Sequence, residues 1–201
     1  MQATFGDPTP APERFEQASR LVVFTEDFQL KWSHCSATAD FLSGFYAGVL
    51  SADRTSEQLN DLSHSIAYLV NELVENALKF CTTGNMEIQA GLDGDDFILR
   101  IANAIEPETS DRFQTLLAEI TDGEPGDLLI QRIEANAEGG SGSGLGLLTL
   151  MSDYGARLSW HFRPAGSGDE RVFLETIARL ALPKANPLSP SKIPTTHRHG
   201  N

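Results

Sequence analysis

The clearest pattern of apolar and polar positions runs from about residue 56 to residue 80. Apolar side chains recur there at steps of three and four positions, at Leu59, Leu62, Ile66, Leu69, Leu73, Ala77 and Phe80. Because an α-helix repeats about every 3.6 residues, this spacing gathers the side chains into one stripe. The segment is therefore predicted to be a long amphipathic helix, with Gly84 as the break after it.

Alternation of apolar and polar residues follows this helix. The segments NMEIQAGL and DDFILRIANAI alternate on either side of residues 93–95, a typical turn sequence, and predict an antiparallel hairpin. ARLSWHF and RVFLETIARL predict two further strands near the end of the chain. Upstream of the helix, LVVFTEDFQLKW predicts an extended segment and ATADFLSGFYAGVLSA a helix, in which Phe41, Phe45 and Val49 are spaced four apart.

Three more helices are predicted in the second half of the chain. Residues 107–122 and 126–137 begin at or just after a proline, which suits the first turn of a helix. The segment LGLLTLMSDYG follows the glycines of residues 139–146 and is predicted to be the third. The chain thus alternates helices with strands, and no internal repeat is visible.

Composition limits the number of domains. The chain has 201 residues, of which 40% are hydrophobic and 21% charged, so one domain with a sizeable core is expected. Residues 1–18 hold several prolines and are predicted to be a flexible N-terminal tail. Residues 183–201 are rich in Pro, Ser and Thr and are predicted to be a disordered C-terminal tail. The folded domain is expected over residues 19–182.

The net charge argues against two classes of partner. A formal charge of -13 and an isoelectric point near 4.7 repel the phosphates of nucleic acids and anionic membrane headgroups. Cys35 and Cys81 are too few for a disulfide framework. The N-terminus has no apolar leader segment, and no run approaches the roughly 18 apolar residues of a membrane span. We therefore expect a cytoplasmic protein that binds neither nucleic acid nor membrane.

Candidate chemistry lies on the long helix, in the segment NELVENALKF. Glu72, Asn76 and Lys79 fall on one helical face beside the apolar stripe, so a carboxylate, an amide and an ammonium meet at the edge of the core. Taken alone, the three residues also suit a solvated face with an ordinary ion pair. Asn76 is the informative member, because asparagine is a poor helix former and its amide oxygen can bind a hard cation such as Mg²⁺.

A glycine-rich segment, EGGSGSGLGLLTL, leads into the third of the later helices. Its glycines let the backbone approach a ligand closely, and the helix N-terminus offers unpaired N–H groups to a phosphate. A flexible loop is the alternative interpretation, since such patterns are weak signals alone. The segment opens no βαβ unit and lacks Gly-Lys-Ser/Thr, which argues against a Rossmann site and a P-loop.

Together the two elements resemble the GHKL (histidine-kinase-like) ATPase family. Glu72-Leu-Val-Glu-Asn76-Ala-Leu-Lys79-Phe is similar to the N-box of that family, and Gly142-Ser-Gly144-Leu-Gly146-Leu is similar to its second glycine box, in the same order. The resemblance implies a Bergerat fold, an α/β two-layer sandwich in which helices cover one face of a mixed, mostly antiparallel sheet. It also implies that ATP and Mg²⁺ bind between the helices and a lid.

The resemblance assigns a role to each matching residue. Asn76 is implied to bind Mg²⁺, Glu72 to act as general base and Lys79 to approach the phosphates. The phosphates are implied to be covered by Gly140, Gly142, Gly144, Leu145 and Gly146. One position departs from the pattern: Asn103 stands where the family has an Asp that binds adenine, and the two glycines that follow this Asp are absent. A neutral amide oxygen is a weaker acceptor than a carboxylate.

With this departure, the chain is similar to the SiaB-type protein kinases, relatives of the anti-sigma-factor serine kinases. The similarity implies ATP-dependent phosphorylation of a Ser or Thr on a small STAS-like antagonist protein in bacterial partner switching. A GHKL-fold module that sequesters a partner without catalysis is the alternative, because the adenine box is altered. Glu72 discriminates between the two, since a pure binding module has little use for a carboxylate facing Asn76. The sequence leaves open whether the chain forms a homodimer.

Overall fold

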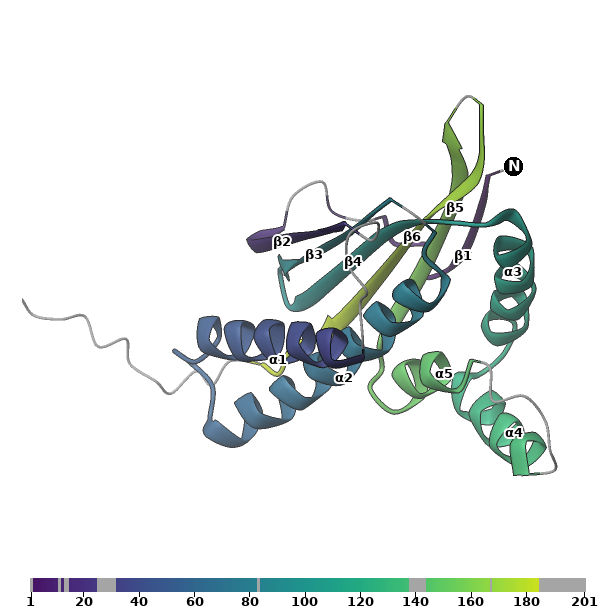
Figure 1. Ribbon diagram of the computed structural model, residues 1–201. Helices are drawn as coiled ribbons and strands as arrows, with labels where there is room; N and C mark the ends of the chain where they lie inside the picture. Colours follow the sequence, from purple (N-terminus) through teal and green to yellow (C-terminus); the bar gives the residue numbers. More distant parts are fainter. Residues whose placement is uncertain are drawn as a thin grey trace, which may run out of the picture.

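The computed structural model places one sheet of six strands against a layer of helices (Figure 1). Its described residues are 2–10, 12, 15–24, 32–82, 84–137, 144–166 and 168–184. The strands lie in the order β1-β5-β6-β4-β3-β2. Their bounds are Ala3–Gly6 (β1), Glu16–Phe24 (β2), Asn85–Asp93 (β3), Asp96–Ile105 (β4), Arg157–Gly166 (β5) and Asp169–Ala181 (β6).

Each of the five pairings between these strands is antiparallel. The expected α/β sandwich is present, but the expectation of a mixed sheet is corrected for the described strands. Two of the pairings are hairpins, β3 with β4 and β5 with β6, and a hairpin can join only antiparallel strands. The hairpin predicted around residues 93–95 is confirmed, as are the two strands near the end of the chain.

The helices form where the apolar spacing predicts them. Their bounds are Trp32–Val49 (α1), Ser56–Phe80 (α2), Pro107–Thr121 (α3), Pro125–Ala137 (α4) and Leu145–Ser152 (α5). α2 begins at a capping box, in which the Thr55 side chain accepts from the Gln58 backbone N–H and the Gln58 side chain accepts from the Thr55 N–H. α1, α2 and α5 lie along one face of the sheet (Figure 1). No helix among the described residues is long and apolar enough to cross a bilayer.

The core lies between α2 and the sheet. The apolar stripe of α2 is buried at Leu62, Ile66, Leu69 and Leu73, whereas Phe80 at the end of the stripe is 37% exposed. The sheet contributes alternate residues of each strand, among them Met86, Ile88, Phe97, Leu99, Trp160 and Phe162. The stripe fixes the rotation of α2 about its axis, and thereby the direction of its polar face.

The N-terminal residues depart from the expected flexible tail over 1–18. Ala3–Gly6 forms strand β1 at one edge of the sheet, and β2 begins at Glu16 at the opposite edge. Residues 7–10 follow β1 along the sheet: the Asp7 N–H donates to the Leu158 carbonyl, and Arg179 donates to the Pro10 carbonyl. Proline suits the extended course of residues 7–10, because it lacks the N–H that a helix interior needs. Of the predicted C-terminal tail, only residues 183–184 are described.

The packing of α1 also differs from the simplest interpretation of its pattern. Phe41 and Phe45, the regularly spaced aromatic residues, are 54% and 43% exposed. The buried side of α1 consists of Cys35, Ala39, Leu42 and Tyr46. α1 is apolar on more than one side, so periodicity alone could not identify the side that packs on the core.

Candidate functional site

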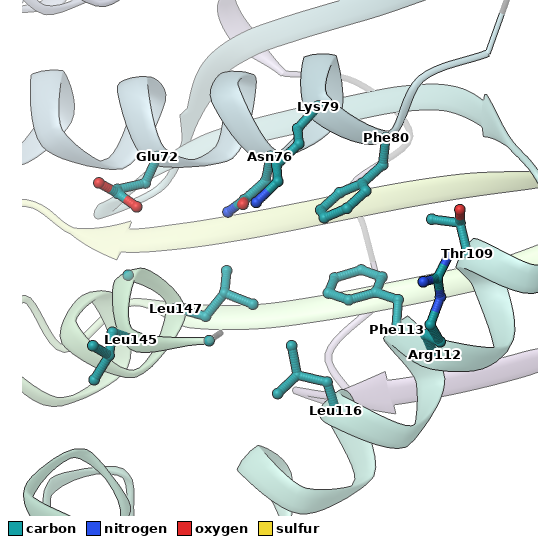
Figure 2. A pocket seen from close by; sticks show the side chains of 12 residues that line it. Glu72, Asn76, Lys79, Phe80, Thr109, Arg112, Phe113, Leu116, Leu145 and Leu147 are labelled. Carbon is teal, nitrogen blue, oxygen red and sulfur yellow. The ribbon is translucent and has the colours of Figure 1, made fainter. Parts of the chain in front are cut away.

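A pocket of about 400 Å³ lies where α2, α3 and the first turn of α5 meet (Figure 2). α2 and α5 carry the two elements singled out in the sequence, and α3 closes the pocket from the other side. The lining residues are Glu72, Asn76, Lys79, Phe80, Thr109, Arg112, Phe113, Leu116, Gly144, Leu145, Gly146 and Leu147. The structure therefore brings together six of the residues predicted to form a site, three from α2 and three from α5 and its N-cap.

α2 presents its polar residues to this pocket in a row. Glu72, Asn76 and Lys79 lie on successive turns of the helix, and Figure 2 shows the side chains of Glu72 and Asn76 directed toward α5. Glu72 and Asn76 are half-buried, whereas Lys79 is exposed. The Lys79 ammonium lies 5.3 Å from the centroid of the Phe80 ring, within the range of a cation–π contact. The row thus runs from the Glu72 carboxylate, beside α5, to the Lys79 ammonium at the opening of the pocket.

Glu72 sits in surroundings that make its carboxylate a stronger base. Burial raises the pKa of Glu72 above its usual value, and the negative charge of Glu75 raises it further. The carboxylate also packs directly against α5: a Cβ built on Gly146 would collide with Glu72 Oε2. Gly146 therefore leaves the space that the Glu72 carboxylate occupies.

The first turn of α5 depends on a second glycine. Gly144, the N-cap residue, has a left-handed conformation with φ of 87°. A Cβ built there would lie 3.1 Å from Leu116 Cδ1 on α3, so a side chain at this position would meet both strain and crowding. The first N–H groups of α5 have no partner within the helix, and this turn lines the pocket, where an anion would satisfy them. Gly140 and Gly142, the other predicted glycines of this box, lie outside the described residues.

A smaller compartment of about 20 Å³ lies beneath the pocket and reaches the sheet. Asn103 on β4 lines it, is 1% exposed, and has a buried side-chain Nδ2 with no hydrogen-bond partner. A buried donor without an acceptor costs about 1–3 kcal/mol, so an unpaired amide in a pocket wall marks a place for a ligand acceptor. Strand alternation places Asn103 on the same face as Leu99 and Ile101, as its position in the sequence predicts.

Two phenylalanine rings border both cavities. Phe80 from α2 and Phe113 from α3 have ring centroids 6.5 Å apart and planes inclined by 24°. Aromatic pairs in proteins commonly have ring centroids about 4.5–7 Å apart, so the two rings form an ordinary offset pair. Figure 2 shows the two rings one above the other, with Phe80 on α2 and Phe113 on α3. Both rings offer flat surfaces to the cavities, but a flat ligand that stacks between them must move them apart.

The contribution of α3 was not found from the sequence. Thr109, Arg112, Phe113 and Leu116 line the pocket, and Arg112 is the one basic residue of α3. Arg112 lies 3.7 Å from Glu108, and both side chains are largely exposed, so the guanidinium is held only weakly. The sequence offered one signal for this role: Arg112 is the single cation in a helix whose other charged residues are carboxylates. Its direction toward α2 depends on contacts between distant parts of the chain.

The chemistry of these groups suits a flat, phosphorylated ligand. Lys79 and Arg112 supply positive charge at the pocket, and the α5 N-terminus supplies backbone donors. Asn76 offers one neutral oxygen, and Mg²⁺ normally completes its six ligands with phosphate oxygens and water. Asn103 and the two phenylalanines offer an amide and stacking surfaces to a planar base.

A comparison with solved structures finds a protein of similar fold. One chain of the crystal structure of the SiaB–SiaC complex from Pseudomonas aeruginosa is similar in fold, with a TM-score of 0.53. The two chains are 16% identical, and the match covers 75% of this chain and 86% of that chain. No family model and no curated protein sequence matches this chain. The protein thus shares an α/β sandwich fold with a component of the SiaB–SiaC complex.

Proposed function

We propose that this protein is an ATP- and Mg²⁺-dependent protein serine/threonine kinase of the partner-switching type, with a GHKL-type site. One observation carries the proposal: Glu72, Asn76 and Lys79 on α2 and Gly144, Leu145 and Gly146 on α5 line a single pocket. The fold likeness to a chain of the SiaB–SiaC complex supports a protein partner for this fold. The proposed substrate is a Ser or Thr hydroxyl on a small STAS-like protein.

The described residues offer a group suited to each part of a nucleotide. The unpaired Asn103 Nδ2 can donate to a base nitrogen while its Oδ1 accepts from a base amine, the two-bond pairing that asparagine makes with adenine. Phe80 and Phe113 would hold the base between their rings. The free N–H groups of α5, together with Lys79 and Arg112, would hold the phosphates. Mg²⁺ would be held by Asn76 and would supply charge neutralisation on the phosphoryl oxygens.

Glu72 is the residue that moves a proton in this proposal. Its carboxylate accepts the proton of the partner's hydroxyl as that oxygen bonds to the γ-phosphorus. The bond from the γ-phosphorus to the oxygen bridging it to the β-phosphate breaks, and ADP leaves. The raised pKa of Glu72 suits this role, because a base works best when its pKa lies near the working pH. Lys79 and Arg112 stabilise the charge that develops on the transferred group.

A second candidate function is a GHKL-fold interaction module that binds a partner without catalysis. The compartment beside Asn103 favours this alternative: about 20 Å³ holds one water molecule, so a base must separate Phe80 from Phe113 to enter. A protein that never opens this gap would keep the fold and its partner surface but lose the nucleotide.

Calorimetry with ATP, with and without Mg²⁺, tests the first step of the proposal. We expect binding that strengthens when Mg²⁺ is present. Mass spectrometry of a co-purifying partner after incubation with Mg-ATP tests the second step, and a mass increase of one phosphoryl group on Ser or Thr is expected. If no adenine nucleotide binds at millimolar concentration, the kinase is refuted and the interaction module is favoured.

A further inference from the structure

The short helix α5 brings its first turn to the pocket, but the contacts there do little to hold it in position. α5 has eight residues, and Gly146, which packs against the Glu72 carboxylate, has no side chain that could lock α5 beside α2. Leu147, Leu148 and Leu150 are buried and keep α5 on the core. Because apolar packing is not directional, the position of α5 along α2 calls for a more specific contact.

Two tyrosine rings supply a contact of this kind. Tyr68 on α2 and Tyr154, just beyond the end of α5, stack with their ring centroids 4.8 Å apart and their planes inclined by only 11°. Both side chains are half-buried and pack against the hydrophobic core. Nearly parallel rings at this separation form a favourable aromatic pair. The stack therefore ties α2 to the end of α5.

The turn from α5 into β5 fixes the backbone that carries Tyr154. The Ala156 N–H donates to the Leu150 carbonyl at 2.9 Å, and Gly155, between Tyr154 and Ala156, has a φ of 62°. Glycine adopts this left-handed conformation without strain where a helix ends. Ala156 is buried at the start of β5, so the turn cannot shift freely. A Tyr154 ring that is held on α2 thus holds the end of α5 as well.

Tyr68 belongs to the same face of α2 as the polar row of the pocket. It stands four residues before Glu72, which places both side chains on one side of the helix. Burial raises the pKa of the Tyr68 phenol, the charge of Glu72 raises it further, and a hydrogen bond with the Thr149 side chain lowers it. Gly146 thus lies against Glu72, and Thr149 and Tyr154 lie against Tyr68. α5 therefore runs antiparallel to α2, with its first turn beside the polar row.

We propose that Tyr68 is a positioning residue for the phosphate-binding turn of α5, acting through its stack on Tyr154. The inference rests on the proposed function, in which this turn holds the phosphates of ATP. Thr149 and Gly144 are separated by a rise of about 7.5 Å along the helix, so a tilt of about 10° would move the first turn by about 1 Å. Without the stack, α5 occupies the binding position for only part of the time, and the apparent affinity for ATP falls by that fraction.

Calorimetry with ATP and with adenosine tests this role in Tyr68→Leu. An aromatic pair changes an equilibrium by a factor of about 2–10, so ATP should bind about 2–10-fold more weakly than to the wild type. Adenosine has no phosphates and should bind both proteins equally. At saturating ATP the phosphates themselves hold α5 in place, so the KM for ATP should rise by the same factor while kcat stays near the wild-type value. A wild-type ATP affinity, or an equal loss for ATP and adenosine, overturns the proposal.

Three further variants show whether the stack itself is responsible. Tyr68→Phe keeps the ring and should restore most of the ATP affinity, whereas Tyr154→Leu should weaken ATP binding as Tyr68→Leu does. The double variant should bind no more weakly than either single one, because both remove the same contact. Phe173→Leu is the matched control: Phe173 is half-buried, lies 4.3 Å from the Arg163 guanidinium and is on the sheet face away from α5. It should bind ATP as the wild type does. A Tyr68→Phe protein that is as weak as Tyr68→Leu overturns the role of the stack.

Hydrogen exchange of the nucleotide-free protein separates a failure of this inference from a failure of the proposed function. If the wild type binds neither ATP nor adenosine, the proposed function fails, and the phosphate role of α5 fails with it. The stack still predicts faster exchange of the α5 amides in Tyr68→Leu, with α2 and β4 unchanged. Faster exchange confined to α5 supports Tyr68 as the anchor of this helix, and unchanged exchange in α5 overturns it. Circular dichroism shows that the variants are folded.

Discussion

Replacing Gly146 by alanine should displace the Glu72 carboxylate with little effect on stability. An alanine at this helical position gains up to about 1 kcal/mol of helix propensity over glycine. The new methyl group would collide with Glu72 Oε2, which is the end of a flexible side chain and can move. Moving a side chain off its rotamer costs about 0.5–1.5 kcal/mol. The two terms nearly cancel, so the free energy of unfolding should stay within about 1 kcal/mol of the wild type.

Phosphoryl transfer should respond far more strongly than stability. A misplacement of about 1 Å in a catalytic group can reduce the rate by about 10²-fold. The rate of partner phosphorylation at saturating ATP should fall by about this factor in Gly146→Ala. Gly48→Ala on α1 is the control, because a Cβ built there meets no atom within 4 Å. It should stabilise the protein by up to about 1 kcal/mol and leave the rate unchanged.

A double-mutant cycle separates this explanation from a general disturbance of α5. Glu72→Ala removes the carboxylate that the new methyl group would strike. In that background Gly146→Ala should stabilise the protein by about 1 kcal/mol, because only the helix propensity remains. Chemical denaturation measures both steps. If Gly146→Ala transfers phosphate at the wild-type rate, the position of Glu72 against α5 is not the one used in catalysis. If the cycle shows no coupling, the two groups do not touch.

Three further predictions concern the same pocket. Glu72→Gln should leave Mg-ATP affinity nearly unchanged but slow phosphoryl transfer by about 10²-fold or more. Asn76→Ala should lower both the Mg-ATP affinity and the rate of transfer. Calorimetry together with rate measurements distinguishes the two variants. Glu75→Gln removes a negative charge that raises the pKa of Glu72, so the acidic limb of the pH–rate profile should move to lower pH. If the acidic limb of the profile does not move, it reports the titration of a group other than Glu72. Asn103→Leu should raise the free energy of unfolding by about 1–3 kcal/mol, because an unpaired buried Nδ2 is lost, and should weaken ATP binding. A destabilised variant would show that the amide is paired in the free protein.

The sequence predicted those parts of the fold that depend on local patterns. The spacing of apolar residues over 56–80 gave α2 its bounds, and alternation around residues 93–95 gave the β3–β4 hairpin. The same reasoning placed Glu72, Asn76 and Lys79 on one face, because the angle between residues of a helix is known. Their shared pocket follows from that face and from the burial of the stripe beside it.

The features that the sequence did not predict depend on contacts between distant segments. Ala3–Gly6 becomes a strand only because β5 offers it an edge, and four residues carry too short a pattern to detect. Arg112 reaches the pocket because α3 lies across from α2, which no local pattern expresses. The exposed Phe41 and Phe45 were ambiguous for another reason: both sides of α1 are apolar, and only the tertiary packing selects one.

The position of the polar row on α2 depends on the opposite side of the same helix. Leu62, Ile66, Leu69 and Leu73 are at most 3% exposed, so the sheet holds α2 at one rotation about its axis. A register change of one residue would turn the row by about 100° and direct Glu72 away from Gly146. Truncating one of these leucines to alanine costs about 2–5 kcal/mol, which is a large part of the stability of a domain this size. Selection for stability and selection for the site therefore act on the same helix. Glu72 can stay half-buried, with no ion pair to another residue that the structure describes, because the apolar stripe beside it prevents α2 from rotating that carboxylate into water.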